Sequence, residues 1–158
     1  MKKLLAIGGV IVIVFALIVV LSNKSNETKL KDNPYETDNL KTSTINLIGD
    51  ENYNSIVLPK DLEKKIKSGE DVTAYFFSPE CPHCIATTPV LMPVAKDMGI
   101  EINQFNLLEF GADAGPYGIE GTPTIVHYKD GKEVDRLYGG APQGMDPEAY
   151  IRDFFEKY

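Results

Sequence analysis

The sequence is short of cysteine, histidine and positive charge. Its 158 residues include two cysteines and two histidines, and 16 basic residues stand against 23 acidic ones, which gives a formal charge of −7. Two thiols are too few for a four-thiolate zinc site. An acidic chain without a basic patch repels nucleic acid and anionic lipid surfaces, so we expect no nucleic-acid partner.

Long repeats are absent as well, and the overall composition is that of an ordinary globular protein. Hydrophobic residues make up 43% of the chain and charged residues 25%. A chain of this length and composition has room for one domain whose core can be buried without disulfide staples.

One long uncharged run stands near the N-terminus. Leu4 to Leu21 contain no charge and no proline, and as a helix they span about 27 Å, close to the hydrocarbon thickness of a bilayer. A secretory signal peptide is the alternative, but its apolar region is usually shorter and ends at an A-x-A-like cleavage site, which this segment lacks. The sequence therefore favours an uncleaved signal anchor over residues 1–21.

The flanks of this run predict its orientation. Lys2 and Lys3 precede it and are expected to stay in the cytoplasm, which places the rest of the chain outside the cell membrane as a single-pass protein. Residues 22–44 are polar, contain Pro34 and lack periodicity, so we expect a flexible stalk. Residues 45–158 then form the folded domain.

The apolar pattern of the domain predicts alternating strands and helices. Helices are expected at 59–67, 85–98 and from Asp146 onward, strands at 72–77, 100–107, 123–128 and 133–138, a first strand or extended arm within 45–58, and a glycine-rich turn at 108–118. Asp130-Gly131 is a strong hairpin signal between the last two strands. This order predicts an α/β fold with a mixed sheet of four to five strands flanked by helices.

The two cysteines stand together at the end of an apolar run, as Cys81-Pro82-His83-Cys84. A disulfide that closes so short a loop constrains the unfolded chain very little, so a reversible redox pair is the remaining interpretation. Cys81 falls at the N-cap of the expected helix, where peptide dipoles lower the pKa of a thiol, and Pro82 fits at N1. We expect Cys81 to be exposed and attacking, and Cys84 to be shielded and resolving.

The two histidines receive different interpretations. His83 lies between the cysteines, where its imidazole can stabilise the Cys81 thiolate, although an exposed loop residue without a role is the alternative. His127 falls in a predicted strand and is interpreted as a satisfied sheet histidine. A zinc site made of the cysteines and histidines would need three ligands from one helical turn, so we predict no metal. Glu80 and Glu109 are interpreted as solvated surface charges.

Four landmarks in order resemble the thioredoxin superfamily over residues 45–158. They are Ser78-Pro79-Glu80-Cys81-Pro82-His83-Cys84, Tyr117 to Thr124, Tyr128 to Lys132, and Tyr138-Gly139-Gly140 before the final helix. The resemblance implies a compact thioredoxin-like fold and no cofactor beyond a redox-active Cys81–Cys84 disulfide.

The resemblance also implies roles for further residues. Pro123 corresponds to the cis-proline that faces the cysteines, and Thr122 before it offers backbone groups to an extended substrate. Pro89 corresponds to the proline that kinks the active-site helix. Gly140, or Gly139, corresponds to the glycine beside the active-site surface.

Two departures from thioredoxin itself bear on function. Tyr75 stands where thioredoxin carries a buried aspartate, and Gln104 stands at the position of its partner lysine. The dipeptide Pro82-His83 resembles DsbA-type oxidases, but the 38 residues between Cys84 and Pro123 are too few for the helical domain that DsbA inserts there.

The expected function is an extracytoplasmic thiol-disulfide oxidoreductase that acts on protein thiols and is recycled by a membrane or extracellular redox partner. Thiolate stabilisation favours oxidation or isomerisation of substrates. Two alternatives remain: a reductase of secreted or cytochrome-maturation thiols, and a non-catalytic accessory or chaperone-like module that binds a secreted peptide.

Overall fold

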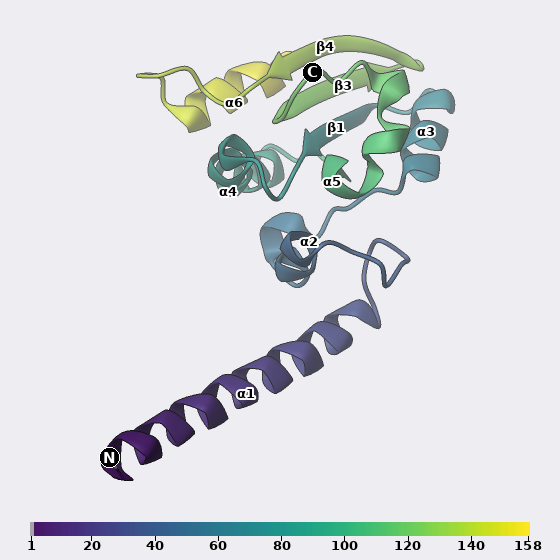
Figure 1. Ribbon diagram of the computed structural model, residues 1–158. Coiled ribbons are helices and arrows are strands. Elements are labelled where there is room, and N and C mark those ends of the chain that lie inside the picture. The colour runs from purple at the N-terminus through teal and green to yellow at the C-terminus, as the bar shows by residue number, and fades with distance from the viewer. Residues whose placement is uncertain (1) are drawn as a thin grey trace. The chain divides into compact units, whose positions relative to one another are not determined.

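The structure, a computed structural model, describes residues 2–158, with side chains described from Ile7 onward. The chain divides into a first unit that ends at Asp38 and a second unit, Asn39–Tyr158. Figure 1 labels helices and strands of both units.

The first unit consists mainly of helix α1 (Lys2–Leu30). Its segment Ile7–Leu30 is long and apolar enough to cross a membrane, with a mean hydropathy of 2.3, although a signal sequence has the same properties. The helix continues through residues 22–30, which the sequence analysis assigned to a flexible stalk. Since a helix, once nucleated, extends at little cost, and residues 22–33 contain neither glycine nor proline, the helix of the apolar run can propagate into this polar segment.

The second unit alternates helices and strands. Its elements are α2 (Thr42–Leu47), η1 (Glu51–Tyr53), α3 (Pro59–Lys67), β1 (Val72–Phe77), α4 (Pro82–Asp97), β2 (Ile102–Asn106), α5 (Leu107–Phe110), η2 (Gly111–Asp113), η3 (Gly115–Tyr117), β3 (Thr124–Lys129), β4 (Lys132–Tyr138) and α6 (Pro147–Phe155). The expected order of elements is confirmed from α3 to α6.

Of the two alternatives expected for residues 45–58, a strand or an extended arm, the strand was wrong. In place of a first strand, this segment contains the second half of α2 and all of η1, and its one β-type pairing among the described residues is an isolated bridge between Ile56 and Gln104. The side chain of Asp50 caps η1 by accepting a hydrogen bond from the backbone N–H of Asn52 at 2.9 Å. This local hydrogen bond gives the backbone an alternative to strand pairing.

The sheet has four strands in the order β2-β1-β3-β4. β1 pairs in parallel with β2 and antiparallel with β3, and β3 pairs antiparallel with β4. Asp130 and Gly131 join β3 to β4 with φ angles of 51° and 76°, as the predicted Asp-Gly turn requires.

Helices cover both faces of this sheet, and every residue of the central strand β1 is buried. Tyr75 and Phe77 point into one core cluster with residues of α4 and α6, whereas Phe76 points into a second cluster with Leu62 of α3. This alternation follows from the two-residue period of a strand. The sheet thus separates the cluster that contains Cys84 from the cluster that contains Leu62. Figure 1 shows α4 and α3 on opposite sides of the sheet.

Helix α6 begins as the sequence predicts. The Asp146 side chain accepts a hydrogen bond from the Glu148 N–H at 3.1 Å, and Pro147 follows the cap. Ile151, Phe154 and Phe155 are buried beneath the helix. The N-terminal end of α6 therefore lies close to α4, where the cysteines are.

Candidate active site

Strand β1 and helix α4 together position the two cysteines. β1 ends at Phe77, and a turn closed by a 3.1 Å hydrogen bond from the Cys81 N–H to the Ser78 carbonyl leads into α4. Cys81 is the N-cap, with extended backbone, and Pro82 is the first helical residue. Both placements agree with the sequence prediction, because proline fits at a position whose N–H would have no helical partner.

The two thiols differ in exposure and in hydrogen bonding. Both are free; Cys81 is half-buried and Cys84 is completely buried. The Cys81 sulfur accepts a hydrogen bond from the Cys84 backbone N–H at 3.4 Å. The Cys81 thiol also donates to the Thr122 carbonyl oxygen at 3.3 Å. A substrate sulfur can therefore reach Cys81, whereas Cys84 is shielded.

The electrostatic environment separates the thiols further. Partial burial alone raises the pKa of Cys81, but hydrogen bonds with Thr122, with Cys84 and with the His83 backbone outweigh it, and the pKa lies below its ordinary value. Burial raises the pKa of Cys84 to about 11. Since a thiolate is the nucleophile in disulfide exchange, Cys81 is the thiol suited to attack and to be attacked.

Thr122 and Pro123 lie directly opposite Cys81. The peptide bond between them is cis, as the resemblance implied. Pro123 is buried, and its carbonyl oxygen accepts a 2.8 Å hydrogen bond from the Gly139 N–H. This bond ties the segment before β3 to the segment after β4, so both stay beside the cysteines.

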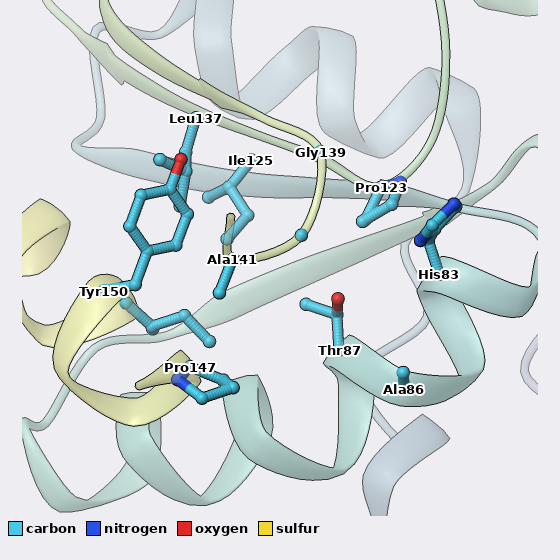
Figure 2. Close-up of a pocket in the computed structure, with 12 residues that line it drawn as sticks. His83, Ala86, Thr87, Pro123, Ile125, Leu137, Gly139, Ala141, Pro147 and Tyr150 are labelled. Atoms are coloured by element: carbon cyan, nitrogen blue, oxygen red, sulfur yellow. The ribbon is translucent and has the colours of Figure 1, made fainter. Parts of the chain in front are cut away.

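His83 is exposed on the first turn of α4. Its backbone contributes to the lowered pKa of Cys81. Its side chain lies beside Pro123 at one end of a pocket, and not in the core (Figure 2). Stabilisation of the thiolate by the imidazole itself stays a prediction.

The pocket beside the cysteines has a volume of about 140 Å³. It is lined by His83, Ala86, Thr87, Pro123, Ile125, Leu137, Gly139, Gly140, Ala141, Pro147, Tyr150 and Ile151. Figure 2 shows side chains of α4, of α6 and of the β3–β4 sheet converging on it. Its lining is mainly apolar, and its polar side chains are those of His83, Thr87 and Tyr150. An apolar pocket next to a reactive thiol can hold a substrate side chain.

Gly140 borders this pocket, as the resemblance implied. A Cβ atom at this position would lie 3.2 Å from the Thr87 hydroxyl oxygen, closer than most Cβ contacts. Thr87 and Tyr150 were not predicted from the sequence to line a pocket. No local pattern marks them, since the pocket forms only where α4, α6 and the sheet meet.

Hydroxyl groups lie beneath Cys84. The Tyr75 hydroxyl is 2.9 Å from the Thr88 hydroxyl oxygen, and the Thr88 hydroxyl donates to the Cys84 carbonyl oxygen at 2.8 Å. Tyr75 pairs in register with Gln104, whose buried side chain donates to the Asn52 carbonyl oxygen at 2.8 Å. The two positions that depart from thioredoxin are therefore both buried and both hydrogen-bonded here.

The remaining candidates have structural roles. The Glu80 carboxylate accepts a 2.9 Å hydrogen bond from the Ser43 hydroxyl, and Glu109 accepts a 2.9 Å hydrogen bond from the Lys41 backbone N–H. Buried His127 lies 3.1 Å from the Thr73 hydroxyl oxygen and stacks on Tyr158, which agrees with a satisfied sheet histidine. Burial lowers the pKa of His127. Among residues 2–158 no cluster of three metal-binding side chains occurs.

Comparisons with known proteins agree with this geometry. The family model described as Thioredoxin matches residues 50–151. The thioredoxin of Chlamydia caviae is 38% identical over 65 residues, covering 40% of this chain and 64% of that protein. The thioredoxin of Chlamydia muridarum is 35% identical over 89 residues, covering 53% and 82%.

A solved structure gives the same result. The X-ray structure of Fasciola hepatica thioredoxin aligns with a TM-score of 0.53 at 28% identity, covering 65% of this chain and 94% of that one. Residues 50–151, which the family model matches, include the cysteines, the cis-proline and the four-stranded sheet.

Proposed function

This chain belongs to the thioredoxin family of thiol-disulfide oxidoreductases, and from this premise we propose that it exchanges disulfides with protein thiols outside the cell membrane, favouring oxidation or isomerisation. One observation carries the proposal: a half-buried Cys81 with a lowered pKa faces Thr122 and Pro123, while Cys84 is shielded behind it.

Oxidation of a substrate follows from this arrangement. A substrate thiolate attacks the Cys81 sulfur of the Cys81–Cys84 disulfide, the bond between the cysteines breaks, and Cys84 leaves and takes up a proton. A second substrate thiolate then attacks the substrate sulfur of the mixed disulfide and releases Cys81 as a thiolate. The substrate has lost two electrons, which the cysteine pair has gained. Reduction is the reverse sequence.

The direction follows from the stability of the Cys81 thiolate. Groups that lower the pKa of Cys81 stabilise the reduced protein, and this makes the disulfide a stronger oxidant. Tyr75, in the place of a buried acid, adds no negative charge beneath the pair. These features, together with Pro82-His83, support oxidation over the reductase alternative.

The location is supported by α1. The segment Ile7–Leu30 has the length and hydropathy of a membrane span, and Lys2 and Lys3 precede it. With these lysines in the cytoplasm, the domain lies on the other side of the membrane. Thiols of secreted proteins, which are oxidised outside the cytoplasm, are then its substrates, and a membrane or extracellular redox partner recycles the pair.

A redox titration against glutathione tests the direction. We expect a reduction potential well above that of thioredoxin, roughly −270 mV, and nearer to that of DsbA, roughly −120 mV. A potential at the thioredoxin value would favour the reductase alternative. The Cys81→Ser variant serves as the control: if it retained cellular function, a non-catalytic binding role would replace the proposal.

A further inference from the structure

Cys84 is surrounded by neutral groups. Its fully buried side chain lies in a cluster with Tyr53 of η1, Tyr75 and Phe77 of β1, Ile125 of β3 and aromatic and aliphatic residues of α4 and α6. Among the described residues of this cluster, the titratable groups are the two tyrosines and Cys84 itself, with Cys81 packed at its edge. The groups that shift the pKa of Cys84 besides burial are the Ser78 backbone, Thr122 and Cys81, and no carboxylate, lysine or histidine is among them.

A buried thiol that attacks a disulfide ordinarily needs a base to remove its proton. Burial raises the pKa of Cys84 to about 11, so the thiolate is scarce at neutral pH. Burial also raises the pKa of Tyr75, and the charge of Cys84 raises it further. The Tyr75 hydroxyl therefore keeps its proton throughout the physiological range, so it can act only as a hydrogen-bond donor or as a neutral acceptor.

The hydrogen bonds of Thr88 determine where the hydroxyl proton of Tyr75 points. Thr88 has one hydroxyl proton and donates it to the Cys84 carbonyl oxygen. In the 2.9 Å contact between the two hydroxyls, Tyr75 must then be the donor and Thr88 the acceptor. Thr88 follows Cys84 by four residues, one helical turn, and a side-chain hydrogen bond with Cys84 is among the causes that raise the pKa of Tyr75.

We propose that the Tyr75 hydroxyl stabilises the Cys84 thiolate, by turning its O–H from Thr88 to the sulfur when Cys84 closes the disulfide. This inference rests on the proposed function, because Cys84 is the leaving thiolate when a substrate is oxidised and the attacking thiolate when the same exchange runs in reverse. A hydrogen bond to a charged acceptor is stronger than one to a neutral hydroxyl. The rotation of the Tyr75 O–H toward Cys84 is therefore favourable only while the Cys84 sulfur carries a negative charge.

The step balances without an added reactant. The Cys84 thiolate attacks the Cys81 sulfur of a mixed disulfide, the Cys81–Cys84 bond forms, and the bond from Cys81 to the substrate sulfur breaks. The substrate departs as a thiolate and takes up the proton that Cys84 has lost. In this step the Cys84 sulfur is oxidised and the substrate sulfur is reduced, while Cys81 remains in a disulfide. Tyr75 is unchanged at the end.

Tyr75→Phe is the variant that tests this inference. It removes only the hydroxyl and keeps the ring, which stacks on Phe77 at a centroid distance of 5.6 Å. Tyr128→Phe is a matched control, because Tyr128 is buried on the other face of the sheet and its hydroxyl is without a hydrogen-bond partner among the described residues. Thermal unfolding of both variants checks that each is folded.

The first measurement is the rate at which Cys84 releases glutathione from a Cys81–glutathione mixed disulfide, as a function of pH. In Tyr75→Phe we expect the rate at neutral pH to fall about tenfold and the pH profile to move up by about one unit. Tyr128→Phe should match the wild type. A Tyr75→Phe profile identical to the wild type would overturn the inference.

The second measurement separates this inference from the proposed function. In a Cys81→Ala background Cys84 is the sole thiol, and its thiolate absorbance can be titrated directly. Adding Tyr75→Phe should raise the pKa of Cys84 by about one further unit. An unchanged pKa would overturn the role of Tyr75. A wild-type protein that releases no glutathione would instead contradict the proposed function, and the titration would still decide the role of Tyr75.

Discussion

At the scale of single residues, the reactivity of the cysteine pair depends on one helical turn. Cys81 caps α4 at the surface and its sulfur accepts a hydrogen bond from the Cys84 N–H, whereas Cys84 is buried in the core beside Tyr75 and apolar side chains. The pKa of the first thiol is lowered and that of the second is raised to about 11. A short motif thus contains both a thiol that reacts with substrate and a thiol protected from it.

The lowered pKa of Cys81 predicts how its alkylation depends on pH. Only the thiolate reacts with iodoacetamide, so the rate should fall as pH drops through the pKa of Cys81, and that midpoint should lie below the ordinary thiol value of about 8.5. Mass spectrometry of the Cys84→Ser variant gives the rate for Cys81 alone. A midpoint at or above about 8.5 would contradict the proposed stabilisation of the thiolate.

The residues near the motif also show what the sequence could and could not predict. Cys81, Pro82 and Pro123 were predicted correctly, because an N-cap, an N1 proline and a cis-proline are marked by local pattern or by resemblance. Thr88 and Tyr150 were not predicted. They matter through contacts between segments far apart in the sequence, which no local pattern contains.

At the scale of elements, α6 closes one side of the pocket beside the cysteines. Pro147 and Tyr150 line the pocket, and the Arg152 guanidinium bridges to Asp97 of α4 at 2.7 Å. The start of α6 therefore affects the shape of the substrate pocket. The end of β3 and the Asp-Gly turn were predictable from their residues, whereas α2 and η1 were not, since Ile45 and Leu47 fit a short helix as well as a strand.

The cap of α6 gives a stability prediction. Asp146→Ala removes the acceptor for the Glu148 N–H and should lower the free energy of unfolding by about 1 kcal/mol. Urea denaturation measures the change. Asp153→Ala is the matched control, because Asp153 is an exposed residue of the same helix and its removal should change stability by less than about 0.5 kcal/mol. Equal effects of the two variants would contradict the capping role.

At the scale of the whole molecule, the chain joins a long apolar helix to a thioredoxin-family domain. The helix α1 extends nine residues past the apolar run, to Leu30, and the folded unit begins at Asn39. The sequence predicted the apolar run but not its helical extension, because the polar residues 22–30 carry no periodic signal. Helix continuation depends on the element that precedes them and not on their own pattern.

The proposed topology predicts which thiol reagents reach Cys81 in cells. A membrane-impermeant maleimide, added after brief reduction, should label half-buried Cys81 as fully in intact cells as in lysed cells. The Cys81→Ser variant should remain unlabelled under both conditions, because Cys84 is buried. Labelling that appears only after lysis would place the domain in the cytoplasm and contradict the proposal.

The burial of Cys84 also makes the reduced domain a reporter of its own local unfolding. A small alkylating reagent reaches Cys84 only in those molecules in which the first turns of α4 have separated from the sheet. In a Cys81→Ala background the alkylation rate of the single remaining thiol therefore measures the free energy of that opening. The same amino acid that closes the disulfide can report how often the active-site helix opens, without any label being introduced.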